Sequence, residues 1–162
     1  MTYRCSKCGE VHEGLPDLGF DYPDPYLEIP EDERPARATY SPDRCTVRDD
    51  DGLHYFLRGV IFIPVIGQTE PFGIGAWVSQ SEENFERYAK GVPMSPTFGW
   101  LVNRIAHYQP TTFLLKTRAH FAEGGLRPTI ELEPTDHPLA VDQRSGISLE
   151  RAWELVHRYM AN

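Results

Sequence analysis

Residues 112 to 133 read TFLLKTRAHFAEGGLRPTIELE, two alternating stretches joined by the turn sequence Ala-Glu-Gly-Gly. Apolar and polar side chains alternate on both sides of this turn, which is the pattern of a β-hairpin with one buried face. Pairing through the turn sets Leu115 opposite Leu132 on the apolar face and Lys116 opposite Glu131 on the polar face. Because one register satisfies both faces, we predict an antiparallel hairpin with these partners.

Outward from this hairpin, the sequence predicts further strands and two helices. His54–Val65 is the most apolar run and is rich in β-branched and aromatic residues, so we expect a central strand there, followed by another at Phe72–Val78. Pro128 has no N–H to donate and predicts a free edge beside the hairpin. A capping-box pattern predicts a helix over 79–90, and an apolar stripe at helical spacing predicts one over 148–160. The predicted fold class is α+β, a mostly antiparallel sheet packed by these two helices, with an N-terminal segment that resembles a zinc knuckle.

Size and composition predict a single domain over residues 1–162. We divide the chain into a knuckle and proline-rich irregular segment at 1–45 and a region of sheet and helices at 46–162. The net charge of −8 disfavours nucleic acid as a ligand, because phosphate binding needs clustered Lys and Arg, and it suits a partner protein with a basic surface. No apolar run approaches the roughly 20 residues that cross a bilayer, and the N-terminus lacks the apolar core of a signal peptide. We therefore expect a cytoplasmic protein with no membrane partner.

Two cysteines near the N-terminus, Cys5 and Cys8, stand in the Cys-x-x-Cys-Gly pattern that is typical of a zinc knuckle. Tetrahedral zinc needs four ligands, and His12 and Cys45 are the candidates for the remaining two, with His12 open to replacement by another group. We predict zinc as the cofactor, at a structural site that anchors the proline-rich segment. A metal-free set of thiols is the main alternative. A redox pair is a weaker one, because that chemistry places the pair at a helix N-terminus after a strand, and only four residues precede Cys5.

Four other residues are candidates for a catalytic groove: Arg58, Trp77, Arg127 and His137. Arg58 stands alone within an apolar strand, where it either clamps a carboxylate or points to solvent at a sheet edge. Asp136 beside His137 can orient an imidazole for base catalysis, although no nucleophile is placed by the sequence. A turn preceding a loop, with His137 bonded locally, is the more ordinary interpretation of that pair.

Several short blocks of this chain occur together and in the same order in one known family. They are Cys5-x-x-Cys8-Gly9-x-x-His12, Asp43-x-Cys45, Trp77-Val78-Ser79, Arg127-Pro128 and His137-Pro138-Leu139-Ala140. The chain resembles the bacterial domain-of-unknown-function family numbered 2199 over nearly its full length. The resemblance implies a stand-alone, cytoplasmic bacterial protein. It carries no catalytic residue over to this chain, because none is established for that family.

Two functions from different classes fit these observations. The first is a non-enzymatic, zinc-stabilised domain that binds a partner protein, one version being an immunity or antitoxin-like protein that masks a basic toxin surface. The second is a small hydrolase-type enzyme with a groove near the four residues named above. Whether the chain is an enzyme stays open at this point, because the second hypothesis requires the four side chains to converge on one pocket.

Overall fold

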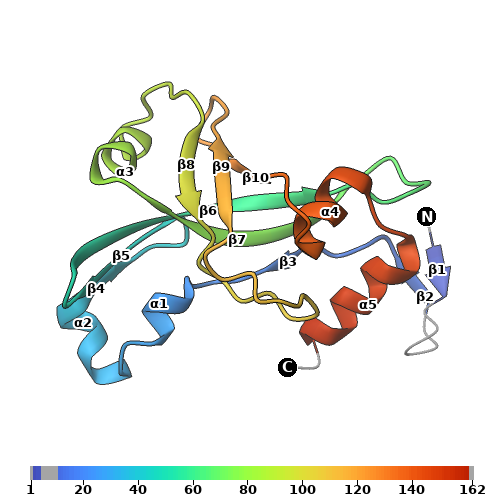
Figure 1. Cartoon of the computed structure of the whole chain (residues 1–162), viewed down its shortest axis with the longest axis horizontal. Coiled ribbons are helices and arrows are strands. Elements are labelled where there is room, and N and C mark those ends of the chain that lie inside the picture. Colours follow the sequence, from blue (N-terminus) through green and yellow to red (C-terminus); the bar gives the residue numbers. More distant parts are fainter. Residues whose placement is uncertain (1, 5–10, 161–162) are drawn as a thin grey trace.

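The computed structural model describes residues 2–4 and 11–160 of the chain (Figure 1). Within them, two short strands form a separate antiparallel pair, β1 (Thr2–Arg4) and β2 (Val11–Glu13). All other described strands belong to one eight-stranded sheet. These strands are β3 (Leu18–Gly19), β4 (Ala38–Tyr40), β5 (Arg44–Asp49), β6 (Gly52–Ile63), β7 (Phe72–Gln80), β8 (Thr97–Trp100), β9 (Lys116–His120) and β10 (Thr129–Leu132).

The described helices include the two that the sequence predicts and three more besides a 3₁₀ turn. They are α1 (Asp24–Leu27), η1 (Glu31–Glu33), α2 (Arg34–Arg37), α3 (Glu82–Ala89), α4 (Pro138–Ser145) and α5 (Leu149–Met160). Helix α3 begins two residues later than the capping-box pattern predicts. Its N-cap is Ser81, whose hydroxyl accepts from the amide of Asn84 at 3.1 Å, whereas Ser79 belongs to β7. None of the described helices has the length and apolar character needed to cross a bilayer.

The sheet is mixed, so the prediction of a mostly antiparallel sheet packed by two helices is wrong. Strand β3 pairs in parallel with β7, and β10 pairs in parallel with β6. The expected free edge at Pro128 is also wrong, because β10 lies between β6 and β9. Pro128 lacks an N–H but keeps its carbonyl, which accepts from the amide of Val60 at 2.9 Å. The missing donor therefore does not prevent β10 from occupying the interior of the sheet.

The predicted hairpin exists, but its register differs from the predicted one by two residues. Strand β10 pairs antiparallel with β9, with Ile130 opposite Ala119 and Leu132 opposite Thr117. A shift of two residues leaves every side chain on its predicted face, because side chains alternate with a period of two. The alternation thus identified the faces correctly. It did not identify the connection, which spans residues 121–128 rather than a tight turn.

The sheet closes on itself where the chain leaves β8. Leu101 forms an antiparallel bridge with Val78 of β7, and the amide of Val102 donates to the carbonyl of Trp77 at 2.9 Å. Strands β7, β6, β10, β9 and β8 consequently form a closed ring, with β8 and β9 crossing steeply over β6 and β7 (Figure 1). Closure removes the edges that these strands would otherwise expose.

Two apolar cores lie on the two faces of β6 and β7. Side chains alternate across these strands, so the residues of β6 divide between the cores. One core joins the ring to α4 and α5 and includes Ile61, Ile74, Val78, Leu101, Ile130, Leu139, Trp153 and Val156. The other lies on the opposite face, over β5, β6 and β7. It consists of Ile29, Cys45, Val47, Phe56, Trp77 and Val102.

Candidate functional site

The outward side of β8, β9 and β10 carries an ordered set of aromatic and charged residues. Phe98 lies opposite Arg118, which lies opposite Glu131 of the next strand. One row further along, Trp100 lies opposite Lys116. Directly paired residues project from the same side of a sheet, so each row sets an aromatic ring beside a cation.

The residues between these outward side chains fix the position of β8. Gly99 alternates with Phe98 and Trp100, and its carbonyl accepts from the buried hydroxyl of Thr117 at 2.7 Å. The amide of Trp100 donates to the hydroxyl of Ser79 at 2.9 Å. These two hydrogen bonds attach β8 to β9 and β7, and the period of two then directs both aromatic rings outward.

Phe98, Trp100 and Leu114 form an exposed apolar patch on this outward side of the sheet. The three residues are 53%, 40% and 51% exposed. The rings of Phe98 and Trp100 meet edge to face, with centroids 5.0 Å apart and an interplanar angle of 87°. This geometry is favourable for aromatic pairs and holds the two rings as one unit. Contiguous exposed apolar side chains bordered by polar ones are typical of surfaces that contact another molecule.

Leu114 is held in the patch with a strained backbone. Its φ angle is +68°, in the left-handed region that β-carbon sterics disfavour for leucine. Its amide donates to the carbonyl of Leu101 at 2.7 Å, and the amide of Leu101 donates to the carbonyl of Leu115 at 2.9 Å. This reciprocal pair of bonds keeps the turn in place. Backbone strain of this kind persists where the surroundings over-determine it, and it occurs preferentially at functional sites.

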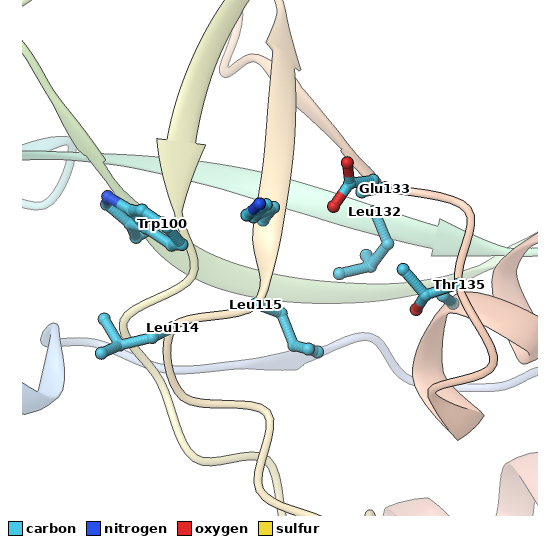
Figure 2. A pocket seen from close by; sticks show the side chains of 8 residues that line it. Trp100, Leu114, Leu115, Leu132, Glu133 and Thr135 are labelled. Carbon is cyan, nitrogen blue, oxygen red and sulfur yellow. The ribbon is translucent and has the colours of Figure 1, made fainter.

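A cavity of about 240 Å³ adjoins the patch. Figure 2 shows Trp100 and Leu114 on one side of it and Glu133 and Thr135 on the other, with Leu115 between them. A smaller hollow of about 120 Å³ shares three lining residues with it: Lys116, Leu132 and Glu133. Sites for small ligands usually measure about 300–1,000 Å³. The larger cavity is therefore the size of one or two amino-acid side chains rather than of a cofactor.

The charged groups around the cavity are free to meet an incoming molecule. Among the residues that the structure describes, neither Lys116, Arg118 nor Glu133 has an oppositely charged group within ion-pair distance. Glu131 does have one, because His120 Nε2 lies 3.1 Å from its carboxylate. Within the described part of the chain, the rim thus presents two cations and one carboxylate without ion-pair partners beside the apolar patch.

The predicted zinc ligands are only partly visible. Cys5 and Cys8 lie outside the described residues, and His12 belongs to β2, although its side chain is not described. Cys45 is a free, fully buried thiol of β5, and burial raises its pKa to about 12. Figure 1 shows β5 at the opposite end of the molecule from β1 and β2. The structure does not bring Cys45 to the N-terminal strands, and within the described ranges no three His, Cys, Asp or Glu side chains form a metal-binding group.

The four residues of the predicted groove do not converge. Arg58 and Trp77 are direct cross-strand partners on β6 and β7, but Trp77 is fully buried and its indole N–H donates to the carbonyl of Phe20 at 2.8 Å. Arg127 donates to the carboxylate of Asp43 at 2.7 Å on the surface. His137 lies elsewhere, at the N-terminus of α4.

His137 is hydrogen-bonded locally, as its ordinary interpretation predicts, but it also begins a helix that we did not predict. Its Nδ1 accepts from the amide of Leu139 at 3.1 Å, so it caps α4, and its Nε2 contacts the carbonyl of Pro110 at 2.8 Å. Pro138 follows as the first helical residue, and Gly146 follows the last, which is the usual asymmetry of helix ends. That signature could have identified α4 where we expected a turn and a loop.

The residues of the apolar patch and its rim were not predicted as a site. Trp100 attracts notice in the sequence as a large aromatic residue, but Phe98, Leu114, Lys116 and Glu133 carry no motif. They come together because β8 pairs with β9 and β9 with β10. No local sequence pattern predicts which short strands pair across long connections.

These features together define the class of protein: a small α+β domain with a mixed sheet closed into a ring, which presents an apolar patch bordered by charges. The chain belongs to the family described as an uncharacterized protein conserved in bacteria (DUF2199), whose sequence model matches residues 4–147. This confirms the resemblance read from the sequence. No curated protein and no solved structure matches the chain.

Proposed function

We propose that this protein is a non-enzymatic docking domain that binds a partner protein through the apolar patch of Phe98, Trp100 and Leu114. The observation that carries the proposal is the position of this patch beside a cavity of about 240 Å³. A partner inserts one apolar side chain into the cavity and covers the patch around it. Lys116 and Glu133 then pair with polar groups that flank the inserted residue.

The composition of the surface matches what is known of binding hot spots. Tryptophan is over-represented among residues whose truncation weakens protein complexes by about 2 kcal/mol or more. Such residues occupy pockets surrounded by groups that exclude water, and here Leu115 and Leu132 supply the apolar walls beside Trp100. The pairing of Phe98 with Trp100 reduces the freedom that the indole ring would otherwise lose on binding.

The net charge of −8 supports a partner whose surface is basic overall. Long-range attraction between opposite net charges raises the rate of association and falls with ionic strength. The charges at the patch itself are of both signs, so they select orientation rather than supply the attraction. One version of this proposal is an immunity or antitoxin-like protein that covers the basic surface of a toxin.

The test compares three single variants with the unaltered chain. Trp100→Ala and Leu114→Ser remove the apolar groups of the patch, and Ile66→Ser removes an apolar side chain that is 69% exposed but does not line the cavity. Proteins retained from lysate of the source bacterium are quantified by mass spectrometry, and the partner is the species retained by the unaltered chain and by Ile66→Ser alone.

The partner is then purified and its Kd is measured with each variant. We expect Kd to rise by about 30-fold or more for Trp100→Ala, the equivalent of a 2 kcal/mol hot spot, and to stay unchanged for Ile66→Ser. We also expect the association rate to fall as salt is raised. Equal retention of every species by all four proteins would refute the proposal, and so would a partner whose Kd ignores both patch substitutions.

A further inference from the structure

The most anomalous charged group in the described part of the chain is the guanidinium of Arg58. Its side chain is only 12% exposed, and its Nε is buried without a hydrogen-bond partner among the residues that the structure describes. The only oppositely charged group within reach among the described residues is Asp21, whose Oδ1 lies 3.6 Å from Nη2. That separation exceeds the range of a hydrogen bond.

Other arginines of this chain are more exposed and yet better satisfied. Arg151 donates from both Nε and Nη2 to Asp142 Oδ2, at 3.2 and 2.9 Å. Arg127 donates to Asp43 at 2.7 Å, and each of these two side chains is 38% exposed. A buried arginine is expected to be better hydrogen-bonded than an exposed one, because a buried cation without hydrogen bonds has a large desolvation penalty.

The backbone around Arg58 is shaped to receive this side chain. A Cβ at Gly19 would lie 3.1 Å from Nη2, and a Cβ at Gly75 would lie 3.7 Å from it. These glycines pair with each other across β3 and β7, so the guanidinium rests on two strands that carry no side chains there. The sequence suggested that Arg58 either clamps a carboxylate or points to solvent at an edge, and its position inside the sheet excludes the second.

Asp21 occupies the solvent side of the guanidinium and can move independently of its backbone. Its side chain is 77% exposed, whereas its carbonyl accepts from the hydroxyl of Tyr40 at 2.6 Å. The backbone is therefore held, and rotation of one exposed side chain opens the guanidinium to solvent. A carboxylate so loosely placed is a weak partner that a better-oriented anion can displace.

We propose that Arg58 is the binding residue of an oxyanion site, in which a ligand carboxylate or phosphate takes the position of the Asp21 carboxylate. The planar guanidinium offers parallel N–H donors that match two oxygens of such a group. The ligand completes the hydrogen bonding of Arg58 and neutralises its charge. This site lies on the face of the sheet that carries Phe56 of β6 and Trp77 of β7, away from the apolar patch of β8 to β10, so it does not depend on the docking function.

The experiment measures the thermal unfolding midpoint of the full chain in sodium acetate and in sodium phosphate, with sodium chloride at matched ionic strength as the reference. We expect one or both oxyanions to raise the midpoint above the chloride value in a saturable way. A response to acetate alone assigns a carboxylate ligand, and a response to phosphate assigns a phosphoryl ligand. No rise above chloride for the unaltered chain and for Asp21→Asn would overturn the proposal.

Two variants separate anion binding from a merely structural ion pair. Asp21→Asn removes the competing carboxylate, so half-saturation should occur at a lower anion concentration, by about tenfold if displacing Asp21 costs 1.4 kcal/mol. Arg58→Met should abolish the anion response while keeping the length of the side chain. If Asp21→Asn instead lowers the midpoint and leaves no anion response, Asp21 and Arg58 form a structural pair and the site does not exist.

Discussion

Gly99 of β8 lies so close to β7 that a Cβ at this position would stand 2.4 Å from the carbonyl oxygen of Ser79. Real Cβ atoms do not approach backbone that closely, so only glycine permits the contact. This close contact between β8 and β7 closes the ring of strands. It also fixes the position of β8, and with it the position of Phe98 and Trp100, which project from the opposite side of that strand. One residue without a side chain thus connects the closure of the sheet to the exposure of the apolar patch.

Substituting Gly99→Ala should destabilise the protein strongly, because backbone rather than a flexible side chain stands in the way. We expect the free energy of unfolding to fall by roughly 3 kcal/mol or more, the range of severe steric substitutions. Urea unfolding followed by circular dichroism measures it. The matched control is Ser79→Ala, which removes the hydroxyl bonded to Trp100 but leaves the close approach intact, and should cost about 1 kcal/mol. Similar losses for the two variants would show that the contact at Gly99 does not restrict the fold.

Asn103 connects β7 to the N-terminal segment and should be among the most sensitive polar residues. It is fully buried; its Oδ1 accepts from the amide of Trp77 at 2.8 Å, and its Nδ2 donates to the carbonyl of Tyr22 at 3.0 Å and to Asp24 at 3.1 Å. Asn103→Ala leaves a buried amide and a carbonyl without partners, which costs about 1–3 kcal/mol for each group. We expect a loss of about 3 kcal/mol by urea unfolding, and a loss below about 1 kcal/mol would contradict this role.

Leu114→Asn tests whether leucine at position 114 lowers the stability of the protein through its strained backbone. Asparagine tolerates a positive φ better than leucine does, and little burial is lost because Leu114 is 51% exposed. We expect the free energy of unfolding to stay the same or to rise by up to about 1 kcal/mol, the scale of the strain at such a residue. Partner binding should weaken at the same time. A clear loss of stability would show that Leu114 serves packing, and the strain would then need no functional reason.

The sequence predicted single strands and helices, and the buried face of each, better than it predicted which strands pair with each other. The sequence correctly predicted a strand at Phe72–Val78, and helical spacing located α5. These signals are local, because they depend on the period of one element. The parallel pairing of β10 with β6 depends on which strand lies next to which, and that is decided by packing across the whole chain.

The same distinction explains why the candidate site escaped prediction. The alternating pattern around Lys116 correctly assigned it to a polar face, but nothing near it in sequence indicates that Trp100 lies directly opposite. Arg58 was noticed because a lone charge in an apolar strand is a local anomaly. Its burial against Gly19 and Gly75 became visible only with the pairing of β3 to β7.

Cys45 should give the stability of the protein a specific dependence on alkaline pH. Burial raises the pKa of its thiol to about 12 in the folded state, whereas an unfolded cysteine has a pKa of about 8.5. A group whose pKa is raised on folding contributes stability that is complete below the unfolded pKa and is lost as the pH rises toward the folded one. The free energy of unfolding should therefore fall between about pH 8.5 and pH 12 more steeply for the unaltered chain than for Cys45→Ala. Parallel curves for the two proteins would contradict the burial of an uncharged thiol.

Zinc remains a prediction for Cys5, Cys8 and His12, and the position of Cys45 sharpens its test. Because Cys45 is packed in the second apolar core, a metal at the N-terminal motif would be held without this thiol. Elemental analysis of protein purified without added metal should find one zinc per chain, in the unaltered protein and in Cys45→Ala alike. The double variant Cys5→Ser, Cys8→Ser should contain none and should unfold at a lower temperature, because structural zinc sites stabilise small domains. Zinc that disappears in Cys45→Ala would restore the four-ligand prediction, and protein free of zinc throughout would leave the motif as a metal-free set of thiols.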